Sequence, residues 1–312
     1  MAKLTLMIGL PGSGKSTYVS QQYDFRRIFL HNVTVLSSDR VRRELYHNEN
    51  DTEHNEEVFS YIKETAVNSL RTGIDVVIDA TNVTRKGRMN LIESIASKIG
   101  YFYEDHSVEY IVIATPYYKC LENNMKRQRQ VPAHVIERMY KNFEFPTRAE
   151  IVNYYSGAIK IVFPFKTNYE IEKPYELLYN FNHENPHHRY SVGKHMFHAG
   201  LVMRHLTNNR VMIKAAEIHD MGKPFCKFYD KSNSEVAHFY NHENVGAYEA
   251  MFYGKGAKFT TDEIIELCSL VNYHMRIHNC ETAAARDRLL TIVGTDLFYK
   301  LQMLMIADKE AH

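Results

Sequence analysis

The sequence has no run of apolar residues long enough to cross a membrane as a helix, which needs roughly 18 of them. Its four cysteines, at positions 120, 226, 268 and 280, show neither paired nor metal-type spacing, which favours reduced thiols and a cytoplasmic location. A net charge of only +1 argues against a surface that coats nucleic acid broadly, but it allows a local basic groove. We find no internal repeat and no low-complexity segment. A globular protein that acts away from membranes is therefore expected.

Two residue patterns divide the chain, whose 312 residues suit two domains. In the first half, short apolar runs alternate with helical segments, which predicts a parallel sheet covered by helices. The predicted strands are Leu4–Gly9, Val33–Ser37, Asp75–Asp79 and Val108–Ala114. In the second half, apolar residues recur at helical spacing, as in Leu201–Leu206, Ile264–Tyr273 and Leu297–Ile306. We predict an α/β domain over residues 1–170 and an all-α domain over residues 171–312, with the boundary in the stretch 165–180.

A glycine-rich loop, GLPGSGKST at residues 9–17, lies between the first predicted strand and a predicted helix. Its pattern, G-x-x-x-x-G-K-S, is that of a P-loop, in which glycines let the backbone N–H groups point at phosphate oxygens. The lysine then adds a charge at the β and γ phosphates, and the serine hydroxyl binds Mg²⁺. The sequence therefore predicts an α/β P-loop domain that binds ATP and Mg²⁺. The expected contacts come from Gly9, Gly12, Ser13, Gly14, Lys15, Ser16 and Thr17.

Polar clusters follow the next two predicted strands. Asp39, in SSDRVRREL at residues 37–45, lies where strand gives way to helix, and from there a carboxylate can reach a hydroxyl near the γ-phosphate. Arg42 lies three residues later on the same helical face. Asp79, in IDATNVTRKGR at residues 78–88, is placed to order Mg²⁺ or its waters. These positions predict a phosphoryl-transfer site beside the P-loop.

A basic segment, MKRQRQVP at residues 125–132, precedes another predicted helix and is typical of a mobile lid. One of its arginines could neutralise the transferred phosphoryl group. A nucleic-acid acceptor would also meet arginines in the loops that follow the strands, which predicts salt-sensitive binding. These arginines are Arg42, Arg43, Arg85, Arg88, Arg127 and Arg129.

Over roughly residues 1–150, this combination resembles the 5′-hydroxyl polynucleotide kinases of phage and bacterial end-repair enzymes. The segments GLPGSGKST, SSDRVR, DATN and VPAHVIERMYKNF carry the resemblance. It implies that Lys15 is catalytic, that Asp39 is the general base and that Arg42 holds the phosphate of the acceptor nucleotide. The catalytic arginine of the lid stays open, because Lys126, Arg127 and Arg129 all compete for its place. Related small-molecule and tRNA kinases share much of this layout.

The second half is rich in histidine: 12 of the 17 histidines lie in residues 151–312. His219 and Asp220 are adjacent in an amphipathic helix, in the segment AAEIHDMGKP. With His195 and Asp308 from other helices, four nitrogen and oxygen ligands would converge, as a divalent metal requires. His242 and His274 could hold a second metal nearby, which makes a two-metal hydrolase possible. Three single histidines are interpreted as surface or core polar residues: His183, His205 and His312.

Over roughly residues 180–312, the chain resembles the HD-domain metal-dependent phosphohydrolases, above all the HD domains attached to bacterial tRNA nucleotidyltransferases. The segments NPHHRYSVGKH and HDMGKP carry the resemblance. It implies a core site of His195, His219, Asp220 and Asp308, with His242 and His274 as ligands of a second metal. Lys223 is implied to meet the substrate phosphate, and His188 could do likewise. The last two ligands could each shift by one helical turn, to His238 and His278.

A kinase fused to an HD phosphoesterase resembles the bifunctional end-healing enzymes of RNA repair, although in the fusions best known the HD half comes first. The resemblance implies ATP-dependent phosphorylation of 5′-hydroxyl ends and removal of 2′,3′-cyclic phosphate or terminal 2′- or 3′-phosphate groups. Mn²⁺, Ni²⁺, Co²⁺ or Zn²⁺ is expected in the second half, because imidazole ligands favour these ions over Mg²⁺. The expected partners are RNA or DNA ends, with RNA favoured, and a separate RNA ligase.

Two other functions stay open at this point. One is a small-molecule or nucleoside kinase fused to an HD nucleotidase in nucleotide metabolism, which nothing in the composition excludes. The other is a nucleotide-sensing regulator in which one half only binds. Intact Lys15, Asp39, His219 and Asp220 argue against such a loss of catalysis.

Overall fold

The computed structural model of the chain describes residues 2–49, 51, 53–100, 102–154, 156–165, 174–185, 189–230 and 233–311. Two compact units form. The first comprises Met1–Ile136 and Glu150–Phe165, and the second comprises Glu137–Ala149 and Lys166–His312. The predicted boundary after residue 170 lies outside the described residues and stays a prediction.

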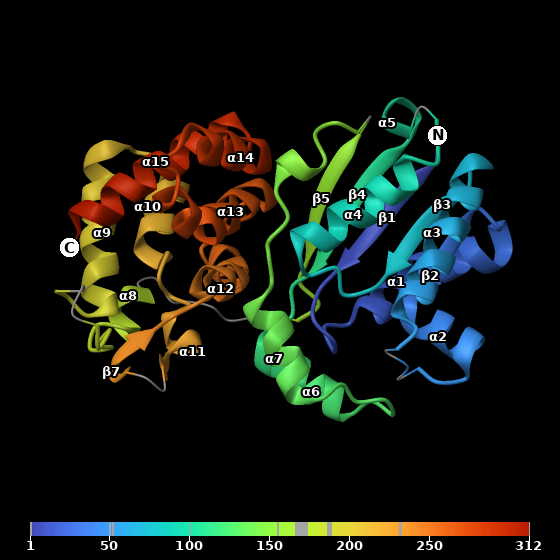
Figure 1. Ribbon diagram of the computed structural model, residues 1–312, viewed down its shortest axis with the longest axis horizontal. Helices are drawn as coiled ribbons and strands as arrows, with labels where there is room; N and C mark the ends of the chain where they lie inside the picture. Colours follow the sequence, from blue (N-terminus) through green and yellow to red (C-terminus); the bar gives the residue numbers. More distant parts are fainter. Residues whose placement is uncertain are drawn as a thin grey trace. The chain divides into compact units, whose positions relative to one another are not determined.

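A five-stranded parallel sheet forms the centre of the first unit (Figure 1), with the strand order β2-β3-β1-β4-β5. Its strands are β1 (Lys3–Ile8), β2 (Val33–Ser37), β3 (Asp75–Asp79), β4 (Ser107–Ile113) and β5 (Gly157–Val162). The four predicted strands are confirmed to within one residue at each end. The fifth, β5, was not predicted, because it is half-exposed and carries Lys160, so it lacks the continuous apolar run of a central strand.

Helices flank this sheet. They are α1 (Lys15–Phe25), the π-helix η1 (Arg26–Leu30), α2 (Ser38–Tyr46), α3 (Asn55–Arg71), α4 (Arg85–Ala96), α5 (Phe102–Asp105) and α6 (Tyr117–Met125). Helix α7 (Ala133–Lys141) and the 3₁₀-helix η2 (Arg148–Glu150) each contain residues of both units. On one face, Val19 of α1 packs with buried strand residues such as Met7 and Val77. Because all strands are parallel, the carboxyl ends of β1, β2 and β3 meet at one edge, where the P-loop, Asp39 and Asp79 follow.

The second unit is mostly helical. Its helices are α8 (Pro174–Leu177), α9 (Val192–Leu206), α10 (Arg210–Ile218), α11 (Lys223–Cys226), α12 (His242–Gly256), α13 (Thr261–His278), α14 (Ala283–Val293) and α15 (Thr295–Glu310). The helical spacing read in the second half is confirmed by α9, α13 and α15. The prediction of an all-α domain is wrong in one respect, because β6 (Phe228–Asp230) pairs antiparallel with β7 (Asn233–His238). Such a short hairpin leaves no buried run that would reveal it in the sequence.

Side-chain caps define where three helices of this unit begin. Ser191 accepts a hydrogen bond from the backbone of Lys194 at the start of α9, and Asn209 caps α10. At α13, Thr260 and Glu263 form a reciprocal capping box. The caps fix the residue at which each helix begins. These helices carry or directly precede histidines of the cluster described below.

The segment Glu137–Ala149 belongs to the second unit although it precedes β5 in the sequence. Phe143 and Phe145 are fully buried there. The Phe145 N–H donates to Oδ1 of Asn272 at 2.9 Å, and Nδ2 of Asn244 donates to the Lys141 carbonyl at 3.0 Å. The two asparagines are joined by a 2.8 Å hydrogen bond between α12 and α13. The chain therefore passes through the second unit before it completes the sheet of the first.

Among the described helices, none is by itself long and apolar enough to cross a membrane. The pair α14 and α15 meets the length and composition criteria only when taken together, across a bend of 119°.

Candidate active sites

The P-loop has the backbone that its glycines predict. Gly12 and Gly14 both take positive φ angles, of 79° and 95°. At Gly12 a side chain is also excluded by space, since a Cβ atom would lie 2.2 Å from the carbonyl oxygen of Cys120. Helix α1 starts at Lys15, so its N-terminus faces the loop and favours an anion there.

Lys15 and Ser16 make the contacts that orient them in this loop. The Lys15 ammonium donates to the carbonyls of Gly9 at 2.9 Å and Leu10 at 2.8 Å. Burial lowers its pKa from the ordinary value, partly opposed by the Asp79 carboxylate. The Ser16 hydroxyl donates to Oδ2 of Asp79 at 2.7 Å. The serine and the aspartate of the predicted Mg²⁺ site therefore lie within one hydrogen bond of each other.

Asp39 stands in the first turn of α2, and three arginines converge on its carboxylate. Arg129 Nη1 lies 2.5 Å and Arg42 Nη1 3.1 Å from Oδ1, whereas Arg127 Nη2 lies 3.8 Å from Oδ2. Arg42 also donates to the side chain of Asn55 at 2.6 Å. The structure thus brings the predicted base, the acceptor arginine and both lid arginines into one cluster. Arg129 makes the closest contact, a difference that the sequence did not show.

Arg88 does not belong to the acceptor surface, and its place among the expected nucleic-acid contacts is corrected. Its side chain is fully buried. Nε donates to Oε2 of Glu150 and Nη2 donates to Oε1, each at 2.9 Å. This bidentate pair joins α4 to η2 inside the first unit. A polynucleotide has no access to its guanidinium.

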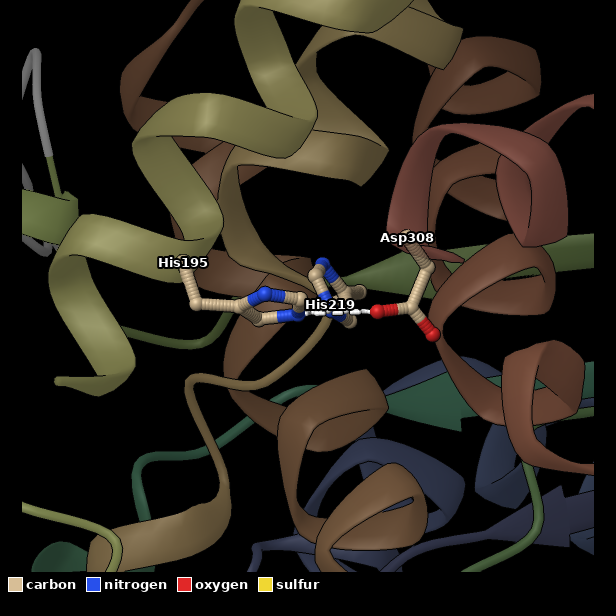
Figure 2. Close-up of side chains that lie close together, drawn as sticks. All are labelled: His195, His219 and Asp308. Carbon is tan, nitrogen blue, oxygen red and sulfur yellow. Dashed lines mark hydrogen bonds and ion pairs between the residues drawn. The ribbon is translucent and has the colours of Figure 1, made fainter. Parts of the chain in front are cut away.

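The second unit contains two groups of buried residues whose atoms could hold metal ions. The first group is His195 on α9, His219 at the end of α10 and Asp308 on α15 (Figure 2). In Figure 2 the three side chains point toward one another from their separate helices. Nε2 of His195 lies 2.8 Å from Oδ1 of Asp308, and Nε2 of His219 lies 3.5 Å from the same oxygen.

The second group is Asp220, His242 and His274. Oδ1 of Asp220 lies 3.1 Å from Nε2 of His242 and 3.7 Å from Nε2 of His274. Its other oxygen, Oδ2, lies 3.5 Å from Nε2 of His219 in the first group. Asp220 therefore faces both groups, with one carboxylate oxygen toward each. All six residues that the sequence singled out as ligands converge here.

Backbone contacts aim the histidine nitrogens at this centre. The Nδ1 atoms of His219, His242 and His274 lie 2.7–2.9 Å from the carbonyls of Ala216, Phe239 and Val271. A carbonyl can only accept, so each Nδ1 carries a proton and each Nε2 is the nitrogen that faces the centre. Nε2 of His242 then lies 3.2 Å from Nε2 of His274. Converging imidazole nitrogens and carboxylate oxygens are the donor set that divalent cations with mixed nitrogen and oxygen ligands require.

The carboxylates of this centre are held ionised. Burial alone would raise the pKa of Asp220, but Lys223 and the surrounding imidazoles hold it well below its ordinary value. Burial would likewise lower the pKa of His219, but the carboxylates of Asp220 and Asp308 raise it to about 9. The cluster therefore holds two ionised carboxylates, and a bound cation would replace the proton that they stabilise on His219.

Lys223 and His183 extend the cluster on one side. The Lys223 ammonium lies 2.6 Å from Oδ2 of Asp220 and donates to Nε2 of His183 at 3.0 Å. Nδ1 of His183 lies 2.9 Å from the carbonyl of Tyr190, which it reaches as a donor. Burial, with Lys223 beside it, lowers the pKa of His183 to about 4, so the ring is neutral at physiological pH. His183 is thus a core polar residue, as interpreted, but one that touches the predicted phosphate-binding lysine.

Other histidines are also placed. His278 contacts Oδ2 of Asp308, one of the metal-type ligands, at 2.8 Å. His238 lies at the end of β7 and belongs to neither group. His205 is exposed on α9, as interpreted. His188 and His312 lie outside the described residues. Sequence reasoning missed the contact of His183 with Lys223, because no spacing rule links residues 40 positions apart.

Part of the chain is similar to a known protein family. Residues 4–146 match the family described as an AAA domain. With the parallel sheet and the glycine-rich loop, this match fits a P-loop domain, whose usual ligands are ATP and Mg²⁺. The matched residues end before the helices that carry the metal-type ligands of the second unit.

Two solved structures are similar to part of the chain. A chain in "Structure of the Pnkp1/Rnl/Hen1 RNA repair complex" is 22% identical with a TM-score of 0.37, over 44% of this chain and 42% of that one. A chain in "Structure of Pnkp1/Rnl/Hen1 complex" is 22% identical with a TM-score of 0.32, over 41% and 39%. This chain thus spans about two fifths of their length. At such TM-scores the likeness establishes neither a shared overall fold nor a shared activity.

Proposed function

We propose that the protein heals broken nucleic-acid ends with two activities: ATP-dependent phosphorylation of 5′-hydroxyl groups and metal-dependent hydrolysis of 2′,3′-cyclic or terminal phosphates. One observation carries the proposal. A single chain holds both a P-loop beside an arginine-bracketed carboxylate and a separate buried centre of six metal-type ligands. The first is suited to phosphoryl transfer from ATP, and the second to phosphoester hydrolysis.

In the kinase reaction, the P-loop amides and Lys15 hold the β and γ phosphates, and Ser16 with Asp79 holds the Mg²⁺ that accompanies ATP. Asp39 accepts the proton of the attacking 5′-hydroxyl. Arg42, on the neighbouring turn of α2, binds the phosphate that follows the terminal nucleoside. Arg129, which lies closer to Asp39 than Arg127 does, neutralises charge on the γ-phosphoryl group as it is transferred.

In the phosphoesterase reaction, His195, His219 and Asp308 would hold one divalent ion, and His242 and His274 the other, with Asp220 between them. Bound ions would supply Lewis acidity toward a phosphoryl oxygen and lower the pKa of a water nucleophile. Lys223, aimed by His183, neutralises charge as the phosphorus centre becomes more anionic. Burial of the whole cluster strengthens each of these electrostatic contacts.

The two reactions are complementary in their products. A strand cut by a metal-independent nuclease carries a 5′-hydroxyl on one side and a 2′,3′-cyclic phosphate on the other, and only RNA has the 2′-hydroxyl that forms this ring. Phosphorylation of the first end and hydrolysis of the second prepare both for joining. We infer that RNA ends are the substrate and that a separate ligase acts afterwards.

The test uses one RNA oligonucleotide with a 5′-hydroxyl and a 2′,3′-cyclic phosphate. It is incubated with the full chain, ATP, Mg²⁺ and Mn²⁺, and both ends are analysed by mass spectrometry. We expect a gain of phosphate at the 5′ end and ring opening or phosphate loss at the 3′ end. A parallel incubation contains nucleosides in place of the oligonucleotide. If the nucleosides are phosphorylated but the oligonucleotide is not, the small-molecule alternative replaces the proposal. If neither end changes, the proposal is wrong.

A further inference from the structure

A small group of aromatic rings stands on the outer face of the β6–β7 hairpin, close in the chain to the metal-type ligands. Phe228 on β6 pairs across the hairpin with His238 on β7, and Tyr240 follows two residues later on the same face. The ring centres of Phe228 lie 5.5 Å from His238 and 5.3 Å from Tyr240. His238 and Tyr240 are stacked, with an interplanar angle of 13°. These three residues are called the aromatic platform below.

The platform is turned toward solvent. Tyr240 is 69% exposed and Phe228 is 38% exposed, although both are large rings. Packing of the rings against one another holds the hairpin in part. However, a side chain as exposed as Tyr240 contributes little burial to that packing, so stability alone does not account for it.

The opposite face of the same segment connects the platform to the hydrolytic cluster. Phe239, between His238 and Tyr240, points inward, where its ring lies 5.7 Å from the Lys223 ammonium and 6.0 Å from the ring of His183. Its carbonyl also receives the Nδ1–H of His242. Tyr240 and His242 are two residues apart, so their Cα atoms are separated by at most about 7.6 Å. The backbone that carries the platform therefore reaches a metal-type ligand within two residues.

The nearby charge does not select the ligand. Lys227, at the start of the hairpin, lies 2.5 Å from Oε1 of Glu184, and the two charges offset each other. The platform offers aromatic surface, on which any of the nucleobases can stack because each has a flat π-face. A phosphate group alone would gain nothing from it.

We propose that the aromatic platform stacks a nucleobase of a single-stranded substrate whose terminal phosphate occupies the metal cluster. This rests on the proposed phosphoesterase function and narrows its substrate to a strand with a base beside the reacting end. The contribution of the platform comes from stacking, so it should not change with ionic strength, unlike contacts to phosphates.

The test compares Tyr240→Ala with Tyr240→Phe in the full chain, on two substrates. One is a 5′-phosphorylated RNA hexamer ending in a 2′,3′-cyclic phosphate, and the other is bis(p-nitrophenyl) phosphate, which has no base. Tyr299→Ala, at a similarly exposed tyrosine on α15, is the matched control. We expect Tyr240→Ala to raise the KM for the hexamer about tenfold at both low and moderate salt, since one stacked base is worth about 1–3 kcal/mol. The KM of Tyr240→Ala for bis(p-nitrophenyl) phosphate should match the wild type. Tyr240→Phe and Tyr299→Ala should match the wild type in their KM for both substrates.

The proposal is overturned if Tyr240→Ala leaves the KM for the hexamer unchanged, or raises the KM for both substrates equally. A separate measurement distinguishes this from failure of the proposed function. If the wild type hydrolyses neither substrate, binding of the fluorescently labelled hexamer is measured by anisotropy. Binding weakened by Tyr240→Ala and kept by Tyr240→Phe would support the platform without the hydrolase, and equal binding by all variants would overturn the platform as well.

Discussion

At the scale of single residues, Asp39 has a second role beside the one that the sequence predicted. It is the expected base, and it is also the anion on which Arg42, Arg127 and Arg129 converge. The spacing of the motifs could place each residue after its strand, but it could not choose between the lid arginines. That choice depends on how the segment after α6 folds back toward α2, which is tertiary structure.

Asp39→Asn should lower kcat of the kinase by about 10²–10⁴-fold and leave the Kd for ATP within about twofold of the wild type. An amide keeps the shape of the side chain but cannot take up the proton of the acceptor hydroxyl in the transition state. The measurements are steady-state kinetics with a 5′-hydroxyl oligonucleotide and equilibrium ATP binding. Asp24→Asn, at a partly exposed aspartate on α1 that pairs with Arg27, is the control. A collapse of ATP binding would instead make Asp39 a residue that holds the nucleotide.

His183 allows a second test at this scale. His183→Ala removes the acceptor of the Lys223 ammonium, whereas His183→Gln keeps an amide oxygen nearby. Loss of such a supporting contact should lower kcat of the phosphoesterase about 10–100-fold, with partial recovery in His183→Gln. His205→Ala, at an exposed histidine of the same unit, should match the wild type. If the alanine and glutamine variants lose activity and thermal stability alike, His183 only fills space.

At the scale of elements, the sequence predicted the strands and helices whose buried apolar residues recur at regular spacing. Four parallel strands and the segments within α9, α13 and α15 were found because their apolar residues repeat with the period of the element. The edge strand β5 and the β6–β7 hairpin were missed, because β5 is half-exposed and β6 is exposed throughout, so neither forms a buried apolar run. The ligand set was found because its six residues stand out by type, whereas the contacts of Arg88 with Glu150 and of His183 with Lys223 join distant segments.

The hydrogen-bonded asparagine pair of α12 and α13 leads to a prediction about stability. Asn272 is buried and binds both Phe145 N–H and Asn244. Asn272→Ala leaves these polar groups without that partner, at a cost of about 1–3 kcal/mol each. The Tm of the second unit should therefore fall by several degrees, at about 2–4 °C per kcal/mol. Differential scanning calorimetry measures this fall in Tm. The control is Asn279→Ala, at an exposed site at the end of α13. Equal melting of both variants would contradict it.

At the scale of the whole molecule, the metal should stabilise one unit only. Its ligands come from α9, α12, α13, α15 and the end of α10, so a bound ion ties these helices together. Saturating Mn²⁺ at about 100 times its Kd would add about 2.7 kcal/mol to the folded state. Calorimetry with and without chelator should show one transition rising with the metal, while a transition that responds to ATP stays in place. No response to any divalent ion would argue against a metal centre.

Two separate active sites on one chain are the central claim, and the most direct measurement scores both activities in two variants. Lys15→Ala and Asp220→Ala are compared with the wild type on an oligonucleotide with a 5′-hydroxyl and a 2′,3′-cyclic phosphate, and metal content is measured in the same preparations. We predict that Lys15→Ala loses 5′ phosphorylation, keeps the metal and still processes the 3′ end. Asp220→Ala should lose the metal and 3′ processing but still phosphorylate the 5′ end. Loss of both activities in either folded variant, or a wild type that binds no metal and hydrolyses no phosphoester, would contradict the account.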